Sequence, residues 1–271
     1  DVVFHLASFS PTHSRGSIYE DPRHWDVTVT GTRNLLAASV ASGCHRLVYF
    51  SSIKAMGEDA GGQGGAADES LPPSPTTLYG KAKREAEKII IDAADRGETQ
   101  ATILRLPMVY GLEGSGNLSR MLEAIARHRF PPVPRVSNRR SAVHASDAVD
   151  AALLSSVRDG ANSRVYLVTD GYGYSTRWIY EQMCSALGMQ IPSWALPLWA
   201  WRLFGGIGSL AERLAQRTMP VSRDTVQKLF GNAWYSPDRI RNELGYQPRH
   251  ELGEEIQRMA DRYLRRTSGT G

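Results

Sequence analysis

Short apolar runs alternate with helical periodicity over the first part of the chain. Apolar runs at 2–6, 46–50 and 102–106 are too short for helices and end in small or polar residues, which predicts buried parallel strands. Between them, 27–42 and 79–94 carry apolar residues at helical spacing. Strand and helix alternating at this interval predict an α/β fold built on a doubly wound parallel sheet.

Beyond Gly111 the pattern becomes richer in helices. The helix predicted over 145–157 should begin at a cap formed by Ser146 or Asp147. We divide the chain into a sheet domain, 1–112, and a smaller helix-rich lobe, 113–271, interleaved with the last sheet strands. The other elements expected in the lobe are a strand at 164–169 and helices at 118–128, 176–187, 197–216 and 252–263.

A Gly- and Pro-rich segment at 58–77 contains the run Gly61 to Gly65. A phosphate-binding loop must follow a strand and open a helix, so that backbone N–H groups face the phosphates. This run leads instead into three prolines, ending at Pro75. We therefore predict a mobile flap at 58–77 and no phosphate loop.

Composition and charge narrow the functional classes. The 271 residues carry a net charge of +4, with 27 Arg and 5 Lys scattered along the chain. No basic run favours a nucleic-acid partner, and scattered arginines suit small anionic ligands. Two isolated cysteines and dispersed histidines predict no metal site and a reducing, cytoplasmic location. The apolar stretch 191–208 includes prolines and Arg202, which predicts a lobe helix, at most interfacial, and no stable membrane insertion.

Tyr79 and Lys83 lie four residues apart on a predicted helix, so both project from one face. A phenol with a reference pKa near 10 is a poor base, and a neighbouring ammonium lowers that pKa. Such a tyrosine can exchange a proton with a substrate hydroxyl. Without further context, the pair could equally be two residues on an exposed helix surface. Ser51 and Ser52 strengthen the functional reading, because they end a parallel strand, where open α/β sheets bind ligands.

At this point the chain resembles the extended short-chain dehydrogenases/reductases, the NAD-dependent epimerase/dehydratase group. Within that group it is most similar to nucleotide-sugar 4-epimerases and UDP-4-ketosugar reductases, through SIK at 52–54 and VTDG at 168–171. The motifs that carry the resemblance follow the family's order and spacing across nearly the whole chain. They are VFHLAS at 3–8, GTRNLL at 31–36, YFSS at 49–52, YGKAK at 79–83, LRLPMVYG at 104–111, RRSAVHASD at 139–147 and RIRNELGYQP at 239–248.

The resemblance implies a role for each matched residue. Tyr79 would be the general acid/base, Lys83 would bind the cofactor ribose and tune the phenol, and Ser52 would polarise the substrate oxygen. Ser52 is preferred to Ser51 because it lies five residues before Gly57. The remaining implied contacts are with NAD or NADP, through Leu6, Ala7, Ser8 and Pro107, and with the substrate, through Asn117 and the diphosphate-binding Arg140.

Three departures from the family pattern matter. The Gly-rich loop and the first strands of a complete Rossmann fold are missing, and the chain starts inside a strand pattern, so we expect a partial Rossmann sheet and a longer natural protein. That partial sheet should expose an edge and bind cofactor poorly on its own. Thr28 stands where the family usually has Asn. Ile53 and Lys54 replace the acidic pair of the dehydratases, which argues against a 4,6-dehydratase.

The sequence therefore predicts a nicotinamide-dependent enzyme that moves a hydride at a sugar carbon of a nucleotide sugar. Epimerase and 4-ketoreductase both remain open, as do NAD and NADP. A second hypothesis is a 3β-hydroxysteroid dehydrogenase-like enzyme, with the apolar segment 191–199 lining a pocket or resting on a membrane. A third, of another class, is a cofactor-binding regulator without turnover. The family resemblance also implies a homodimer formed through the helices at 27–42 and 79–94.

Overall fold

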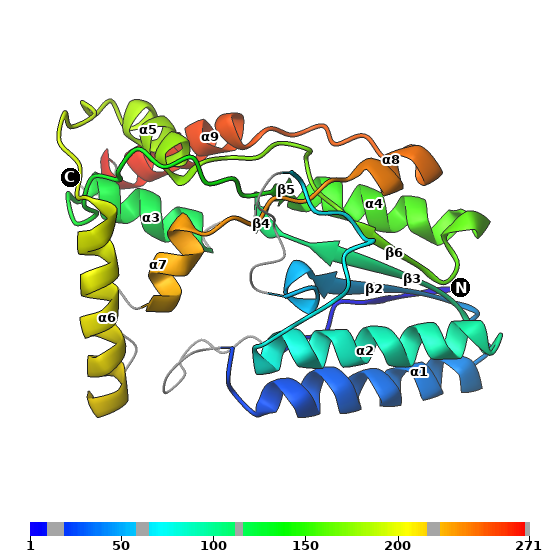
Figure 1. Ribbon diagram of the computed structural model, residues 1–271. Helices are drawn as coiled ribbons and strands as arrows, with labels where there is room; N and C mark the ends of the chain where they lie inside the picture. The colour runs from blue at the N-terminus through cyan, green and yellow to red at the C-terminus, as the bar shows by residue number, and fades with distance from the viewer. Residues whose placement is uncertain (10–18, 58–64, 112–115, 216–222, 269–271) are drawn as a thin grey trace.

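The computed structural model describes residues 1–9, 19–57, 65–111, 116–215 and 223–268 (Figure 1). Its main sheet is parallel, in the order β1 (Val2–His5), β2 (Arg46–Ser52), β3 (Gln100–Leu106) and β6 (Arg164–Leu167). The register pairs His5 with Tyr49 and Ser52 with Leu106, so the carboxyl ends of the first three strands meet at one edge. The predicted α/β fold with a parallel sheet is confirmed.

Helices cover both faces of the sheet (Figure 1). α1 (Gly31–Ala41) and α2 (Leu78–Asp95) lie on one face, while α4 (Ala145–Val157) and α8 (Asp238–Leu244) lie on the other. Successive side chains of a strand point to opposite faces. In β2, Leu47 and Tyr49 therefore point into the core under α1 and α2. Val48, between them, points into the core under α4 on the other face. The sheet is therefore buried on both sides, as its uninterrupted apolar runs predicted.

Two irregular elements lie near the sheet edge where the strands end. The helix predicted from residue 27 begins instead as a π-helix, Trp25–Thr30, which continues into α1. A short 3₁₀ helix, Ile53–Ala55, follows β2 directly. Single π-helical turns are uncommon and occur frequently at functional sites, because they redirect side chains that a regular helix would misplace.

The lobe has a core of its own. It contains a small parallel pair, β4 (Met108–Tyr110) and β5 (Ala142–His144), packed with α3 (Asn117–Ala126), α5 (Thr176–Ala186) and α9 (Leu252–Ser268). The sequence pattern missed β4 and β5 because three residues are too few to show a period of two. A 3₁₀ turn, Asp159–Ala161, leads the chain back to β6, so the segment after residue 112 contributes the last strand of the main sheet. The boundary between the two domains stays a prediction.

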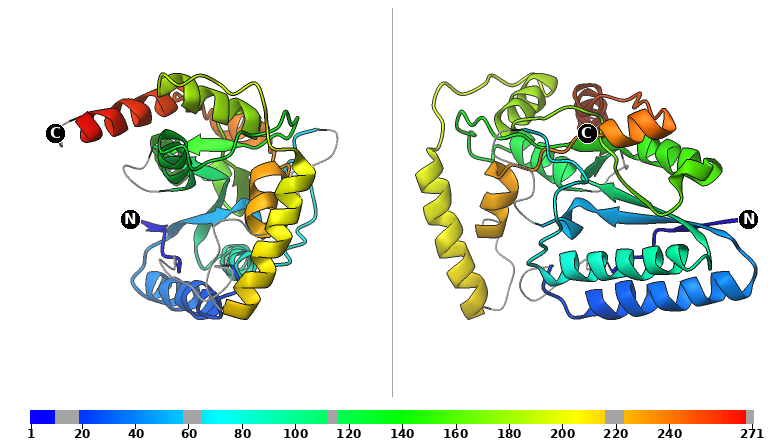
Figure 2. Two further views of the ribbon diagram at one scale, coloured as in Figure 1. Left: turned by 90° about the vertical axis from the view of Figure 1, so that its left-hand side faces the viewer. Right: turned by 45° about the vertical axis from the view of Figure 1, so that its right-hand side comes forward.

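α6 (Leu198–Ala215) and α7 (Arg223–Phe230) stand at one end of the molecule, beyond the carboxyl ends of the strands (Figures 1 and 2). The pattern anticipated α6 but missed the eight-residue α7. Within the described part of the chain, no helix is long and apolar enough to cross a membrane. The Gly-rich run of the predicted flap falls largely in 58–64, outside the described residues, whereas Ala67 forms a bridge with Tyr235 of the lobe.

Candidate active site

Three strand ends bring together residues that lie far apart in the sequence. Leu6, Ala7 and Ser8 follow β1, Ser52 closes β2, and Pro107 follows β3. Because Ser52 and Leu106 are register partners, Pro107 lies immediately beyond the position opposite Ser52. Leu6 and Ala7 are exposed and Ser8 and Pro107 are half-buried. The sequence-predicted cofactor contacts therefore share one edge with the predicted catalytic serine, where an open α/β sheet binds ligands.

Tyr79 is the second residue of α2, and the start of this helix is fixed against the end of β2. The side chain of Thr77 caps the helix by accepting from the Gly80 N–H at 3.2 Å. A Cβ at Gly80 would lie 2.5 Å from the carbonyl oxygen of Lys54, so only glycine permits this approach. The close packing places the Tyr79 phenol in hydrogen-bonding contact with the Ser52 side chain. The two residues predicted to act on one substrate oxygen are thus adjacent.

Burial raises the pKa of the Tyr79 phenol to about 12, and its contact with Ser52 lowers it only in part. The sequence argument expected Lys83 to lower this pKa. In the structure the Lys83 Nζ donates instead to the carbonyl oxygen of Phe50 at 2.9 Å, and loss of hydration on burial is the largest influence on the pKa of the phenol. The expected direction is therefore wrong for this arrangement, and the phenol is held in its protonated form.

Lys83 is buried on the inner face of α2, with its Nζ 4.8 Å from the centre of the Tyr49 ring. Burial lowers the pKa of its ammonium to about 8, and Glu87, one turn further along α2, partly opposes that shift. Burial, with the charge of Lys83 as a second cause, also lowers the pKa of the nearby His5 to about 4. Shifts of this kind gather where an enzyme prepares a site for proton transfer.

A buried ion pair lies directly below the predicted catalytic residues. The carboxylate of Glu87, with no exposed surface, accepts from Arg105 Nε at 2.9 Å and Nη2 at 2.7 Å and from Ser51 Oγ at 2.6 Å. Ser51 therefore turns toward this network, and Ser52 faces the other side of the strand, as successive residues must. This alternation supports the preference for Ser52 over Ser51.

Tyr19, in the segment before α1, is where residues of the lobe meet the predicted catalytic residues. Its ring lies 5.5 Å from that of Tyr79, and its carbonyl oxygen accepts from the Tyr79 N–H at 2.9 Å. Two lysines also lie over this ring, Lys54 at 5.5 Å and Lys228 of α7 at 4.3 Å. Arg140, on the lobe, is close enough for its charge to interact with the same phenol. Tyr19 thus joins the predicted catalytic residues to the predicted substrate-binding arginine.

Hydrogen bonds fix both the backbone and the side chain of Arg140. Its N–H and carbonyl exchange hydrogen bonds of 3.0 and 2.9 Å with Tyr174, and its Nη1 donates to the carbonyl oxygen of Gly231 at 3.2 Å. Burial lowers the pKa of the guanidinium from its ordinary value. A partly buried cation that has no carboxylate partner among the described residues suits an anionic ligand.

The sequence pattern did not predict some residues of the site, and one predicted residue, Asn117, makes no described contact with the others. Tyr19 and His24, whose rings lie 5.5 and 5.0 Å from that of Tyr79, come from a segment without periodicity, so the sequence carried no signal for them. Lys228 belongs to the helix that the pattern overlooked. Asn117, the first residue of α3, is exposed and makes no described contact with Tyr79 or Arg140. Its predicted substrate contact stays a prediction.

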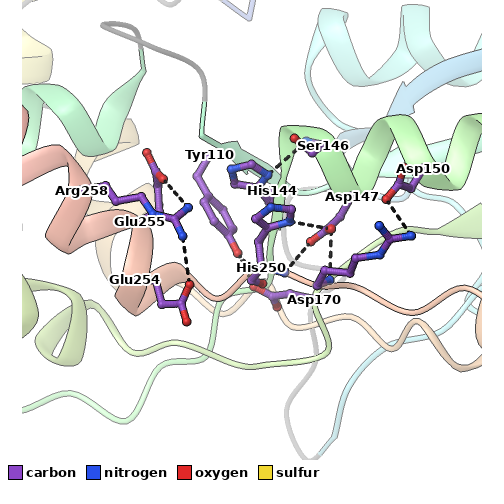
Figure 3. Close-up of polar contacts among 11 residues, drawn as sticks. Tyr110, His144, Ser146, Asp147, Asp150, Asp170, His250, Glu254, Glu255 and Arg258 are labelled. Carbon is purple, nitrogen blue, oxygen red and sulfur yellow. Dashed lines mark hydrogen bonds and ion pairs between the residues drawn. The ribbon is translucent and has the colours of Figure 1, made fainter.

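A second polar cluster lies in the lobe, around Asp147 and His250 (Figure 3). The fully buried Asp147 carboxylate accepts from the N–H groups of Arg249 and His250 at 3.1 and 3.2 Å and pairs with His250 Nδ1 at 2.8 Å. The His250 ring stacks on His144 at 3.9 Å. His144, and not the predicted Ser146 or Asp147, caps α4, because its Nδ1 accepts from the Ser146 N–H at 3.2 Å while Asp147 points into the cluster.

A family model decides what kind of protein contains this site. Residues 1–169 match the model described as the NAD dependent epimerase/dehydratase family. The chain belongs to the NAD dependent epimerase/dehydratase family. Its members are enzymes of the extended short-chain dehydrogenase type, with epimerases, dehydratases and dehydrogenases among them, and the chain resembles their nucleotide-sugar branch at low sequence identity.

Relatives in this family act on chemically different substrates. A UDP-glucose 4-epimerase of Vibrio cholerae is 27% identical over 88% of this chain and 69% of its own length. An N-acetyl-α-D-glucosaminyl-diphospho-ditrans,octacis-undecaprenol 4-epimerase of Escherichia coli O157:H7 is 24% identical, over 95% and 76%. A 3β-hydroxysteroid dehydrogenase/decarboxylase of Arabidopsis thaliana is 26% identical, over 97% and 62%.

Solved structures of the family share the fold. The UDP-glucose 4-epimerase of Thermotoga maritima with UDP-glucose superposes with a TM-score of 0.73 at 19% identity, over 98% of this chain and 77% of its own. MoeE5 in complex with UDP-glucose and NAD superposes with a TM-score of 0.71 at 23% identity, over 98% and 79%.

The residues present fit one half of the family's dinucleotide cofactor. Three buried polar atoms near the strand ends have no hydrogen-bond partner among the described residues: His5 Nδ1, Thr28 Oγ1 and the Tyr49 hydroxyl. Buried polar atoms are nearly always paired, so the unpaired atoms of His5 and Tyr49, which both lie near Lys83, suit a polar ligand such as the nicotinamide ribose. Thr28, at the position where the family usually has Asn, is buried and carries the third unpaired atom.

Proposed function

We propose that the chain forms the catalytic edge and substrate lobe of an NAD(P)-dependent epimerase or 4-ketoreductase that acts on a nucleotide sugar. One observation carries the proposal: the Tyr79 phenol touches Ser52 at the joint end of three strands and is linked through Tyr19 to Arg140. This arrangement provides a proton donor, an oxygen-binding hydroxyl and a diphosphate-binding cation around one space.

Each side chain then has a distinct role. Ser52 donates a hydrogen bond to the sugar oxygen, and Tyr79 gives a proton to it or takes one from it. Lys83 holds the ribose hydroxyls, and Arg140 holds the substrate diphosphate. The chain contributes the cofactor-facing contacts with Leu6, Ala7, Ser8 and Pro107, and a bound nicotinamide supplies the hydride chemistry. Because burial raises the pKa of Tyr79 to about 12, the phenol is in the form that reduction of a ketone requires.

The direct test incubates the protein with UDP-glucose or UDP-N-acetylglucosamine and NAD, and follows sugar stereochemistry by NMR together with cofactor absorbance. Inversion at C4 without net reduced cofactor would support the epimerase. Oxidation of reduced cofactor by a UDP-4-ketosugar, without inversion, would support the reductase. Silence in both assays, with cofactor binding verified by calorimetry, would count against a nucleotide-sugar substrate.

A 3β-hydroxysteroid dehydrogenase-like activity is the second candidate. Two observations favour it: the relative from Arabidopsis thaliana, and the exposed apolar side chains of Ile191, Trp194 and Trp199. The buried Arg140 favours the sugar instead. Thermal protection by UDP, with none by a sterol, would support the nucleotide sugar, and the reverse result would support the steroid.

A regulator without turnover is the third candidate. It fits less well because both Tyr79 and Lys83 are kept and are buried together. We also propose a cytoplasmic homodimer formed through α1 and α2, which lie side by side on one outer face of the sheet (Figure 1). Sedimentation equilibrium would test the dimer, and a monomer at all concentrations would contradict it.

A further inference from the structure

The outward face of α6 is apolar where a surface helix is normally polar. Trp199, Leu203 and Ile207, spaced four residues apart, form one stripe and are 68%, 55% and 57% exposed. The opposite face, with Trp201, packs inward against the rings of Phe130 and Phe230. A helix at the edge of a soluble protein should place its polar residues outward. The stripe therefore calls for an apolar environment outside the molecule.

The same surface continues into the segment before α6. Trp194 is 62% exposed and Ile191 is also exposed, while the Leu196 N–H donates to the carbonyl oxygen of Pro132 and fixes this segment to the lobe. Tryptophan concentrates at membrane–water interfaces, where an apolar ring with a polar N–H fits the headgroup level. Two exposed tryptophans five residues apart, Trp194 and Trp199, match this environment.

Exposed basic residues occur on α6 and in the segment that it contacts. Arg202 is an exposed residue of α6, and Arg129 and Arg135 stand three residues before and after Pro132, whose carbonyl oxygen accepts from Leu196. All three are exposed and have no carboxylate partner among the described residues. Over 191–230 the sequence holds five basic and two acidic residues. An excess of basic residues in the same segment as exposed apolar and aromatic side chains complements an anionic bilayer surface.

A second exposed apolar stripe provides a contrast. Val149, Leu153 and Val157 of α4 have the same four-residue spacing and similar exposure. This stripe has no aromatic residue, and its neighbouring surface position is the acidic Asp150. The Asp150 carboxylate pairs with Arg249, so this face presents no excess of basic charge beside its stripe. Exposed apolar area is thus common to both helices, whereas exposed tryptophan, and an Arg202 with no carboxylate partner in the described part of the chain, distinguish α6.

We propose that α6 and residues 191–197 dock on the surface of an anionic lipid bilayer, with α6 lying in the interface and no segment crossing it. The docking surface adjoins the candidate active site. A cavity of about 480 Å³ lies between α6 and α7, lined in part by Leu198, Arg202 and Gly231, and the carbonyl oxygen of Gly231 accepts from Arg140. The bilayer would therefore lie beside the entrance to the lobe. The proposal does not depend on which substrate is turned over.

Vesicle flotation tests the proposal without any activity measurement. Vesicles of phosphatidylcholine mixed with phosphatidylglycerol should bind the protein and float with it. Much less protein should float with vesicles of pure phosphatidylcholine, or with the mixed vesicles at high salt. Trp199→Ser/Leu203→Ser/Ile207→Ser should weaken binding at least about tenfold, because the anchoring side chains are removed. The matched control, Val149→Ser/Leu153→Ser/Val157→Ser, should bind as the wild type does. Arg202→Glu should weaken binding to the anionic vesicles.

A spectroscopic measurement covers the case in which the triple variant fails to fold. Brominated phosphatidylcholine in the anionic vesicles should quench tryptophan fluorescence of the wild-type protein, and Trp194→Phe/Trp199→Phe should remove most of that quenching. Absence of wild-type binding, or equal loss of binding in the α4 control, would overturn the proposal. So would dissociation of a wild-type dimer by the α6 changes without any vesicle binding, because the occupant of the surface would then be a second copy.

Discussion

Two clusters of buried titratable groups differ in how many of their polar atoms have hydrogen-bond partners within the protein. In the lobe cluster, the Asp147 carboxylate accepts from two backbone N–H groups and from His250, and Tyr110 donates to the His250 carbonyl oxygen at 3.0 Å. One buried hydroxyl close to this carboxylate, that of Tyr246, has no partner among the described residues. At the strand ends, by contrast, His5, Thr28 and Tyr49 each bury a polar atom without a partner among the described residues, and Lys83 is an ammonium in a site that favours the neutral amine.

The difference separates a structural cluster from a functional one. A carboxylate whose hydrogen-bond acceptor sites are filled from within the protein stabilises the fold and has little to offer a ligand. An incomplete hydrogen-bond network costs stability, and a protein retains it where a ligand completes it. We therefore expect changes in the strand-end cluster to affect activity more than stability, and changes in the lobe cluster to do the reverse.

Tyr79→Phe should produce the largest effect. Removing the phenolic hydroxyl takes away the proton donor, so turnover should fall about a thousandfold, equivalent to about 4 kcal/mol of barrier. Thermal unfolding should change little, because the ring and its contacts with Tyr19 and His24 remain. Steady-state kinetics and calorimetry measure both quantities. Tyr172→Phe, at an exposed tyrosine, is the control, and retained turnover in Tyr79→Phe would refute the catalytic assignment.

Asp147→Ala should give the opposite result. It leaves the N–H groups of Arg249 and His250 and the His250 ring without their acceptor inside the protein, so the free energy of unfolding should fall by about 3 kcal/mol. Urea unfolding measures this loss. Asp150→Ala, which removes only an exposed pairing with Arg249, should stay within about 0.5 kcal/mol of the wild type. Equal losses in both variants would show that the lobe cluster has no special structural role.

The sequence anticipated the sheet and singled out Tyr79 and Lys83 as candidate catalytic residues for different reasons. β2 and α2 are long enough for their periodicity to identify them, and the motif around Tyr79 and Lys83 is specific for the family. Tyr19 escaped prediction because its role depends on a contact between an irregular segment and α2, which no local pattern encodes. The direction in which Lys83 points was also beyond reach. Helical spacing places two residues on one face but does not determine which acceptor a flexible ammonium selects.

Lys83→Met sharpens the comparison, because it should abolish turnover without lowering stability at neutral pH. Burial lowers the folded-state pKa of Lys83 from 10.5 to about 8, so below pH 8 the folded protein carries the whole cost of the buried charge, and that cost disappears as the pH rises toward 10.5. The shift corresponds to about 3 kcal/mol, and losing the hydrogen bond to Phe50 offsets part of it. We expect a gain of about 2 kcal/mol at pH 7.

Chemical unfolding of Lys83→Met at several pH values measures this gain, which should shrink between pH 8 and pH 10.5. Lys88→Met, at an exposed lysine of the same helix, should show no such pH dependence. A constant difference across this range, or a loss at pH 7, would mean that Lys83 is not held at a cost in stability.

Asp170→Asn should produce the smallest effect and tests the lobe cluster from within. Burial raises the pKa of Asp170 from 3.8 to about 6, so the folded protein binds the extra proton between these values, and the charged carboxylate destabilises it increasingly as the pH rises to 6. Asparagine removes that charge but has one acceptor oxygen for the donors Tyr110, Tyr172 and Tyr174. The variant should lose stability at pH 4 and recover relative to the wild type as the pH rises to 7, by about 2 kcal/mol. Melting temperatures of the variant and the wild type at pH 4 and pH 7 measure this change. A difference that does not depend on pH would mean that burial does not raise the pKa of Asp170, and that the lobe cluster holds this charge without a cost in stability.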